Sequence, residues 1–168
     1  MMLRHLSETH RELVHQLRNE AEEWLASKGL DQYQRGPRAQ LAHKDIDRLF
    51  DAGQFVGWFD GGEPLAVVAL TDPDPDFWTV EEMAEPQGYL SRFLVREHGC
   101  GHGDKLLDAV IHDQAARQRQ WLRLDCWRTN TALHQYYLNH GFKHLRTETV
   151  PGRWSGALFQ RPLAKDAY

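Results

Sequence analysis

The strongest structural signal in the sequence is Val95-Arg-Glu-His-Gly-Cys-Gly-His-Gly-Asp-Lys-Leu-Leu107. It follows a strand-like run, Tyr89–Val95, and leads into a helix whose apolar residues fall at helical spacing. Gly99, Gly101 and Gly103 lack the Cβ atoms that would keep a ligand away from the backbone. The N–H groups of such a turn and of the first helical turn favour a phosphate or pyrophosphate. We therefore predict an anion-binding turn here.

Four other interpretations of this turn are possible. A P-loop ends in Gly-Lys-Ser/Thr, and the chain has Gly103-Asp-Lys-Leu106 instead. The dinucleotide fingerprint places its third glycine one residue later, although Asp125 lies about where a ribose-binding acid belongs. A metal site at His98, Cys100 and His102 is disfavoured, because alternate residues of a tight turn rarely converge on one ion, so we expect no metal. A purely structural turn stays open.

The rest of the chain alternates between helical and strand-like periodicity. One helix carries Leu13 to Leu25 and should end at Gly29, and a shorter one should stop at Gly53. Asp60-Gly-Gly62 predicts a hairpin. Further strands are expected at 89–95, 121–127, 142–149 and 154–161, with helices after the glycine turn and over 131–140. This order predicts an α/β (α+β) fold, with a mixed, mostly antiparallel sheet flanked by helices in one domain over residues 1–168.

Composition narrows the class of protein. The 168 residues are 41% hydrophobic and 26% charged, which excludes disorder, a coiled coil and a disulfide-stapled miniprotein. The net charge of −4 disfavours nucleic acid as the main ligand. No apolar run is long enough to span a bilayer, and the N-terminus lacks a secretory signal. With only two cysteines, a reducing cytoplasm is the expected location.

The run Val95–Leu107 resembles the acetyl-CoA motif of the GNAT superfamily of N-acetyltransferases, Gln/Arg-x-x-Gly-x-Gly/Ala after a strand and before a helix that carries Leu-Leu. Arg96, Gly99 and Gly101 match by letters. The register of His98, Gly101 and Gly103 also places the helix leucines correctly, and we prefer it. It departs from the family by a histidine at the Gln/Arg position.

A second motif follows in the right order. Asn130-Thr-Ala-Leu-His-Gln-Tyr-Tyr-Leu-Asn-His-Gly-Phe142 resembles the family's Asn-x-x-Ala-x-x-x-Tyr-x-x-x-Gly-Phe segment. The resemblance covers Tyr89–Phe142 closely and the N-terminal half only loosely. It implies the acetyltransferase fold, acetyl-CoA as co-substrate and a primary amine as acceptor. The net charge and the hydropathy add the expectation of no nucleic acid and no membrane partner. Whether the protein is a monomer or a homodimer stays open.

The resemblance also implies roles for individual residues. Backbone N–H groups of Phe93, Leu94 and Val95 would polarise the thioester carbonyl. The turn, made of His98, Gly99, Cys100, Gly101, His102 and Gly103, would hold the pyrophosphate of the cofactor. Tyr137 would protonate the departing thiolate. Asn130 would contact the cofactor or cap a helix, and Tyr136 is expected in the core.

Two further roles are less specific to the motifs. Asp125 occupies the strand position where some protein N-terminus acetyltransferases of the superfamily carry a catalytic glutamate, and a water chain is the alternative base. Six acids lie between Asp72 and Glu85 without a lysine or arginine. Among them, Asp76 and Glu81, with Trp78, are expected to bind a cationic amine, unless this is an ordinary solvated loop.

Three functions therefore stay open at this point. The preferred one is transfer of an acetyl group to a small cationic amine. The second is acetylation of a protein or peptide N-terminus by the same chemistry. The third is a non-catalytic acyl-CoA binding module, which the retained Tyr137 disfavours. Toxins of the superfamily that acetylate aminoacyl-tRNA are disfavoured by the net charge of −4.

Overall fold

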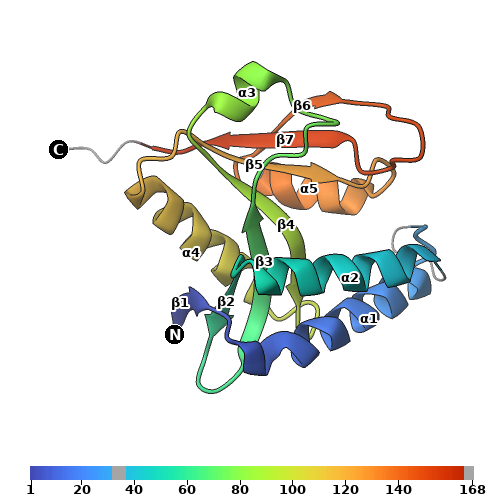
Figure 1. Cartoon of the computed structure of the whole chain (residues 1–168), viewed down its shortest axis with the longest axis vertical. Helices are drawn as coiled ribbons and strands as arrows, with labels where there is room; N and C mark the ends of the chain where they lie inside the picture. The colour runs from blue at the N-terminus through green and yellow to red at the C-terminus, as the bar shows by residue number, and fades with distance from the viewer. Residues whose placement is uncertain (32–36, 165–168) are drawn as a thin grey trace. The chain divides into compact units, whose positions relative to one another are not determined.

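A computed structural model describes residues 1–31 and 37–164 (Figure 1). The chain divides into two compact units. The first contains Met1–Leu70 and Arg92–Val110, and the second contains Thr71–Ser91 and Ile111–Tyr168. Three elements contribute residues to both units: strands β3 (Pro64–Thr71) and β4 (Gln87–Val95) and helix α4 (His102–Ala116).

The first unit contains an antiparallel meander. Strand β1 (Met2–His5) pairs with β2 (Phe55–Phe59), and β2 pairs with β3 (Pro64–Thr71). The C-terminal half of β4 follows β3 in the strand order. The hairpin predicted around residues 60–62 is confirmed, whereas β1 was not predicted, because its four residues become a strand only by pairing with β2 more than 50 residues later.

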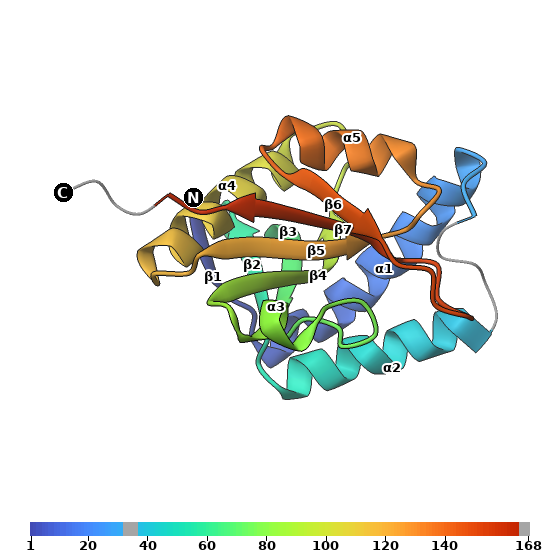
Figure 2. The same ribbon diagram turned by 90° about the horizontal axis from the view of Figure 1, so that it is seen from above.

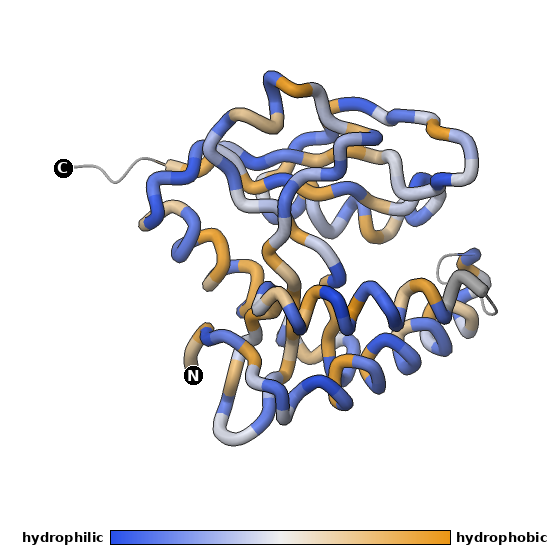
Figure 3. Tube along the Cα trace, viewed as in Figure 1, coloured by the Kyte–Doolittle hydropathy of each residue, from blue (hydrophilic) through white to orange (hydrophobic). Residues whose placement is uncertain are grey.

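The helices of the first unit are η1 (Glu8–His10), α1 (Arg11–Ser27) and α2 (Pro37–Asp51). Figures 1 and 2 show α1 and α2 side by side. Both end as predicted at a glycine with a left-handed backbone, Gly29 at φ +72° and Gly53 at φ +68°. Figure 3 shows apolar and polar residues alternating along both helices. This is the pattern of helices that bury one face.

The core of the first unit joins both helices to the sheet. Its buried side chains come from α1, α2, β2, β3 and β4, and they are Val14, Leu17, Ala21, Ile46, Leu49, Phe55, Val67, Ala69 and Leu94. The α1 members recur at intervals of three and four residues, so one face of the helix is buried. Trp24 fits the same spacing but is 39% exposed, and its ring stacks on His98.

The second unit is built on β5 (Trp121–Cys126), β6 (Lys143–Thr147) and β7 (Ala157–Pro162). The N-terminal half of β4 pairs with β5 in parallel, and the antiparallel partners β7 and β6 follow in the order β4-β5-β7-β6. Helices α3 (Val80–Ala84) and α5 (Thr131–Asn139) lie on opposite sides of these strands (Figures 1 and 2).

The predicted fold class is confirmed: the sheet is mixed and mostly antiparallel, with helices packed on it. A single domain over residues 1–168 stays a prediction. β4 is the strand that positions the predicted site, because it ends directly before the glycine turn and α4 begins directly after it.

Candidate functional site

The glycine turn has the backbone that its sequence predicts. Gly99 and Gly101 adopt left-handed conformations at φ +87° and φ +78°. A Cβ atom added at either residue would meet nothing within 4 Å, so the space over the backbone is open to a ligand. Helix α4 begins at His102, and its first N–H groups have no partner within the helix. The turn therefore presents the features of a helix N-terminal anion site.

The buried face of α4 includes the two leucines that follow the glycine turn. Leu106 and Leu107 are both 0% exposed, and the register that places His98, Gly101 and Gly103 on the motif stays a prediction. His98, at the Gln/Arg position, stacks on the Trp24 ring of α1 with centroids 4.3 Å apart and ring planes 8° apart. Partial burial lowers the pKa of His98, so its imidazole favours the neutral form.

Two other side chains of the turn point toward each other. Cys100 is exposed, and His102 is the half-buried first residue of α4. The Cys100 sulfur, a ring nitrogen of His102 and a carboxylate oxygen of Glu97 all lie within 4.8 Å of one another. His98 does not join this group, because its ring stacks on Trp24, and the expectation that the turn holds no metal stays a prediction.

The parallel pairing of β4 with β5 stops before the C-terminal end of β4. The parallel register described for these strands covers Gln87–Leu90 against Trp121–Leu124. Two residues later Arg92 has φ +54°, which interrupts the regular strand. Leu94 is buried in the core of the first unit, and Phe93 and Val95 are half-buried. The segment predicted to polarise a thioester thus lies beyond the parallel pairing.

Tyr137 is a buried aromatic residue of α5. It is 4% exposed, and its ring packs against Phe142 with centroids 5.4 Å apart and against Phe159 of β7 at 6.3 Å. Tyr136 is only half-buried, so the expectation that Tyr136 is the core residue of the pair is wrong. The helix turns its second tyrosine, rather than its first, toward the sheet. The catalytic role of Tyr137 stays a prediction.

Asn130 acts as the N-cap of α5. Its side-chain oxygen accepts a hydrogen bond from the Leu133 N–H at 3.1 Å, and the residue is 4% exposed. One of the two predicted uses of this side chain, helix capping, is therefore present. A contact between Asn130 and the cofactor stays a prediction.

Asp125 of β5 is part of a buried hydrogen-bonded chain. The Tyr89 hydroxyl of β4 donates to its carboxylate, and Trp78 Nε1 donates to the Tyr89 hydroxyl at 2.9 Å. Burial raises the pKa of Asp125 above its ordinary value, against the opposing effect of the Tyr89 hydrogen bond. Burial, followed by the charge of Asp125, also raises the pKa of Tyr89, so the phenol keeps its proton. Sequence reasoning did not single out Tyr89.

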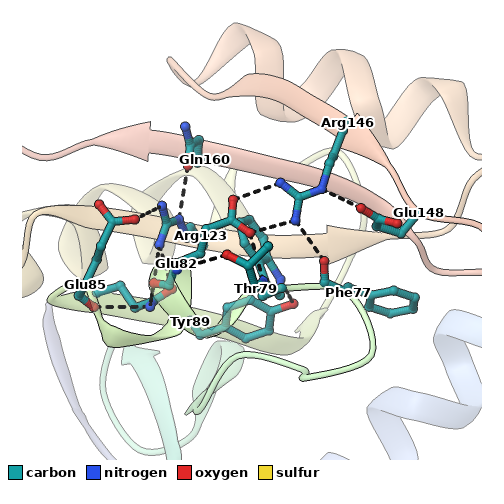
Figure 4. A network of polar contacts seen from close by, with 11 residues as sticks. Phe77, Thr79, Glu82, Glu85, Tyr89, Arg123, Arg146, Glu148 and Gln160 are labelled. Carbon is teal, nitrogen blue, oxygen red and sulfur yellow. Dashed lines mark hydrogen bonds and ion pairs between the residues drawn. The ribbon is translucent and has the colours of Figure 1, made fainter.

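The acidic segment is largely paired with arginines from distant positions. Arg153 contacts Asp74 and Asp76, each at 2.6 Å. Arg146 contacts Glu82 at 2.6 Å, and the buried Arg123 contacts Glu85 at 2.9 Å (Figure 4). Asp72 and Glu81 are exposed. The ion pairs reduce the negative charge that this segment can offer to a cationic ligand.

The aromatic residues of the same segment are core residues of the second unit. Phe77 and Trp78 are each 3% exposed and cluster with Tyr89 and Leu158. The guanidinium groups that lie over these rings belong to Arg123 and Arg146, 5.0 and 5.8 Å from the Trp78 centroid, and to Arg153, 4.7 Å from the Phe77 centroid. Binding of an acceptor by Asp76, Trp78 and Glu81 stays a prediction.

None of the helices in the described residues combines the length and apolar character that a membrane span needs.

A family model and a curated relative both identify this chain as similar to N-acetyltransferases. The Acetyltransferase (GNAT) family matches residues 14–142. A relative from Bacillus subtilis, the uncharacterized N-acetyltransferase YesJ, is 30% identical over 129 residues, which are 73% of this chain and 71% of the relative.

Solved structures show the same fold. A GNAT-family acetyltransferase from Listeria monocytogenes matches with a TM-score of 0.74 and 19% identity, over 96% of this chain and 94% of the other. The PaiA N-acetyltransferase from Thermoplasma acidophilum, solved in complex with coenzyme A, matches with a TM-score of 0.66 and 16% identity, over 95% and 97%. The strand, glycine turn and helix at 87–116 lie within the family match. The chain belongs to the GNAT acetyltransferase family.

Proposed function

We propose that this acetyltransferase uses acetyl-CoA as donor and binds its pyrophosphate at the His98–Gly103 turn. The observation that carries the proposal is the open, left-handed backbone at Gly99 and Gly101, directly before the N-terminus of α4. A pyrophosphate is a dianion at neutral pH, and such a helix start supplies both N–H donors and a positive dipole end. No side-chain charge is needed for this contact, so a histidine at position 98 is compatible with it.

The acceptor that we propose is a primary amine. An alkyl ammonium has a pKa of about 10.4, so only about one molecule in a thousand is nucleophilic at neutral pH. The enzyme must remove one proton from nitrogen. As the new C–N bond forms and the C–S bond breaks, it must also stabilise charge on the carbonyl oxygen and return a proton to the leaving thiolate.

Three groups of this chain are proposed for those tasks. Backbone N–H groups of Phe93–Val95 stabilise the carbonyl oxygen, which is supported by the departure of this segment from the ladder with β5. Asp125 accepts the amine proton, which is supported by its raised pKa, because a carboxylate with a higher proton affinity is a stronger base. Tyr137 donates its phenolic proton to the thiolate.

We further propose that the acceptor is small and cationic. The support is the acidity of residues 72–85 together with a net charge of −4 for the chain. Glu81, exposed on α3, is the best-placed of the proposed acceptor residues. The negative charge of Asp76 is offset by the neighbouring Arg153. Trp78 is buried and donates its N–H to Tyr89, so it would contact an acceptor only if its side chain moved.

Calorimetry of acetyl-CoA binding tests the turn. In Gly101→Val the new side chain fills the open space over the turn, and we expect the affinity for acetyl-CoA to fall at least about tenfold. Gly152→Val is the matched control, because Gly152 has φ +76° and equally open surroundings, so it carries the same backbone strain. Unchanged binding in a folded Gly101→Val protein, or an equal loss in both variants, would overturn the proposal.

A further inference from the structure

We propose that Glu97, Cys100 and His102 form a binding site for a thiophilic divalent cation, with Zn²⁺ as the best fit. The three side chains come from one short segment, the turn between β4 and α4. Each offers one ligand atom, and the three atoms lie within 4.8 Å of one another. The metal site that the sequence analysis disfavoured included His98, whereas in the structure the Glu97 carboxylate, and not His98, lies close to Cys100 and His102.

The geometry needs only a small contraction to hold an ion. Zinc bonds of about 2.0–2.3 Å in a tetrahedron place neighbouring ligand atoms roughly 3.3–3.8 Å apart. Glu97 and Cys100 are exposed, so their side chains can close by this amount through rotamer changes. The backbone between them forms a tight turn, since Glu97 has φ +50° and Gly99 has φ +87°. His102, the first residue of α4, supplies the third ligand.

The ligand types decide which cation fits. A thiolate and an imidazole select Zn²⁺ over Mg²⁺ or Ca²⁺, which prefer oxygen ligands. Three protein ligands leave a fourth position open to water or to another molecule. The charges also balance, because the thiolate and the Glu97 carboxylate together offset the two positive charges of the ion. Binding therefore releases the Cys100 thiol proton to solvent.

One consequence rests on the proposed function. The metal ligands at Cys100 and His102 flank Gly101, whose backbone we propose for the pyrophosphate. An ion that draws both side chains together occupies the same turn, so Zn²⁺ and acetyl-CoA should compete. Zinc should raise the KM for acetyl-CoA and leave kcat at saturating acetyl-CoA unchanged.

The metal site is tested first without any cofactor. Tag-free, fully reduced protein is titrated with Co²⁺ as a spectroscopic probe and then with Zn²⁺ as competitor. We expect one ion per chain at this site, a thiolate-to-cobalt charge-transfer band, and loss of that band when Zn²⁺ displaces Co²⁺. Mg²⁺ should not displace it. Absence of the thiolate band in folded wild-type protein overturns the proposal.

Single variants locate the ion. Cys100→Ser should abolish the charge-transfer band, and His102→Ala and Glu97→Gln should weaken zinc binding at least about tenfold, because removal of a direct ligand costs no less than removal of its supporting partner. Cys126→Ala removes the other, buried thiol, and His112→Gln removes an exposed histidine of the same helix. Both controls should keep the band. A band that survives Cys100→Ser or disappears in Cys126→Ala refutes the site.

The metal site and the proposed function can be refuted independently of each other. If acetyl-CoA binds but cobalt gives no thiolate band, the metal site is refuted and the function stands. If cobalt binds through Cys100 but acetyl-CoA does not bind, the metal site stands and the proposed function is refuted. If both bind and zinc leaves the KM for acetyl-CoA unchanged, the predicted competition is wrong.

Discussion

The hydroxyl of Tyr89 on β4 donates a hydrogen bond to the carboxylate of Asp125 on β5. The parallel register makes this contact, because Tyr89 lies opposite Arg123, and Asp125 is two residues further along the same face of the strand. Burial and the hydrogen bond act on Asp125 in opposite directions: burial raises its pKa, and the hydrogen bond from Tyr89 lowers it. Tyr89 is therefore a positioning residue for the proposed base.

Tyr89→Phe should shift the acid limb of the pH dependence of kcat/KM. Removal of the hydroxyl takes away the hydrogen bond that favours the carboxylate, so the pKa of Asp125 rises further. A base must be deprotonated to act, and the acid limb of kcat/KM should therefore shift to higher pH. Tyr136→Phe, on the half-buried neighbour of Tyr137, is the control and should leave the profile in place. An unshifted limb in Tyr89→Phe would indicate that Asp125 is not the titrating base.

Tyr137→Phe should distinguish a catalytic role of the Tyr137 hydroxyl from a packing role of its ring. The ring is 4% exposed among aromatic neighbours, and phenylalanine keeps that packing while removing the proton. We expect kcat to fall by about 100-fold, the usual contribution of one general acid, with acetyl-CoA affinity retained. Steady-state kinetics and calorimetry measure the two quantities. Wild-type kcat in the variant would reduce Tyr137 to a core residue.

The adjacent acids Glu81 and Glu82 should behave differently. Glu82 accepts two hydrogen bonds from Arg146, which with lesser contributions hold its pKa at about 2 instead of 4.5. The lowered pKa of Glu82 contributes on the order of 3 kcal/mol of stability, present above pH 4.5 and lost as the pH falls toward 2. Glu82→Gln should therefore lower the Tm at pH 7 and flatten the dependence of stability on pH between these values. A Tm unchanged at pH 7 would contradict the ion pair.

Glu81→Gln should affect the acceptor instead. The exposed carboxylate lies in an acidic segment whose other charges are mostly paired, so its removal should raise the KM for a polycationic acceptor and leave the Tm and the KM for acetyl-CoA level. Added salt should raise the acceptor KM of the wild-type enzyme. If the acceptor KM responds neither to the substitution nor to salt, residues 72–85 have only a structural role.

Asp76→Asn gives a second comparison in the same segment. Its carboxylate is 2.6 Å from Arg153, which also contacts Asp74 at 2.6 Å, so the substitution changes the net charge by the same one unit as Glu81→Gln while Arg153 keeps one carboxylate partner. If the exposed Glu81 binds the acceptor directly, the acceptor KM should rise less in Asp76→Asn than in Glu81→Gln. An equal or larger rise in Asp76→Asn would show that Glu81 has no special role in binding the acceptor.

The parts of the fold that depend on neighbouring residues were predictable. Gly29 and Gly53 end helices because the left-handed backbone is a local requirement, and the hairpin and the glycine turn follow the same logic. The missed contacts are those between residues far apart in sequence. Arg146 reaches back 64 residues to Glu82, and Tyr89 reaches Asp125 across 36. An acidic run without basic residues therefore gave no sign that its charges are paired.

The same distinction applies to the candidate site. The motif around Gly101 and the capping role of Asn130 depend only on residues close in sequence, and both were predictable. The stacking of His98 on Trp24 joins α1 to the turn across more than 70 residues, and the convergence of Glu97 with Cys100 depends on the exact backbone of the turn. The stacking follows from tertiary structure, and the approach of Glu97 to Cys100 follows from backbone angles of the turn that residue types alone do not specify.

Acceptor-dependent thiol release from acetyl-CoA tests the central claim most directly. The purified protein is assayed against polyamines, aminoglycosides, amino acids and peptides with free N-termini, with the acetylated product identified by mass spectrometry. We predict thiol release that depends on a small cationic amine, with one amide formed for each thiol released. Binding of acetyl-CoA without transfer to any amine would contradict an enzymatic role, and transfer confined to peptide N-termini would contradict the proposed acceptor.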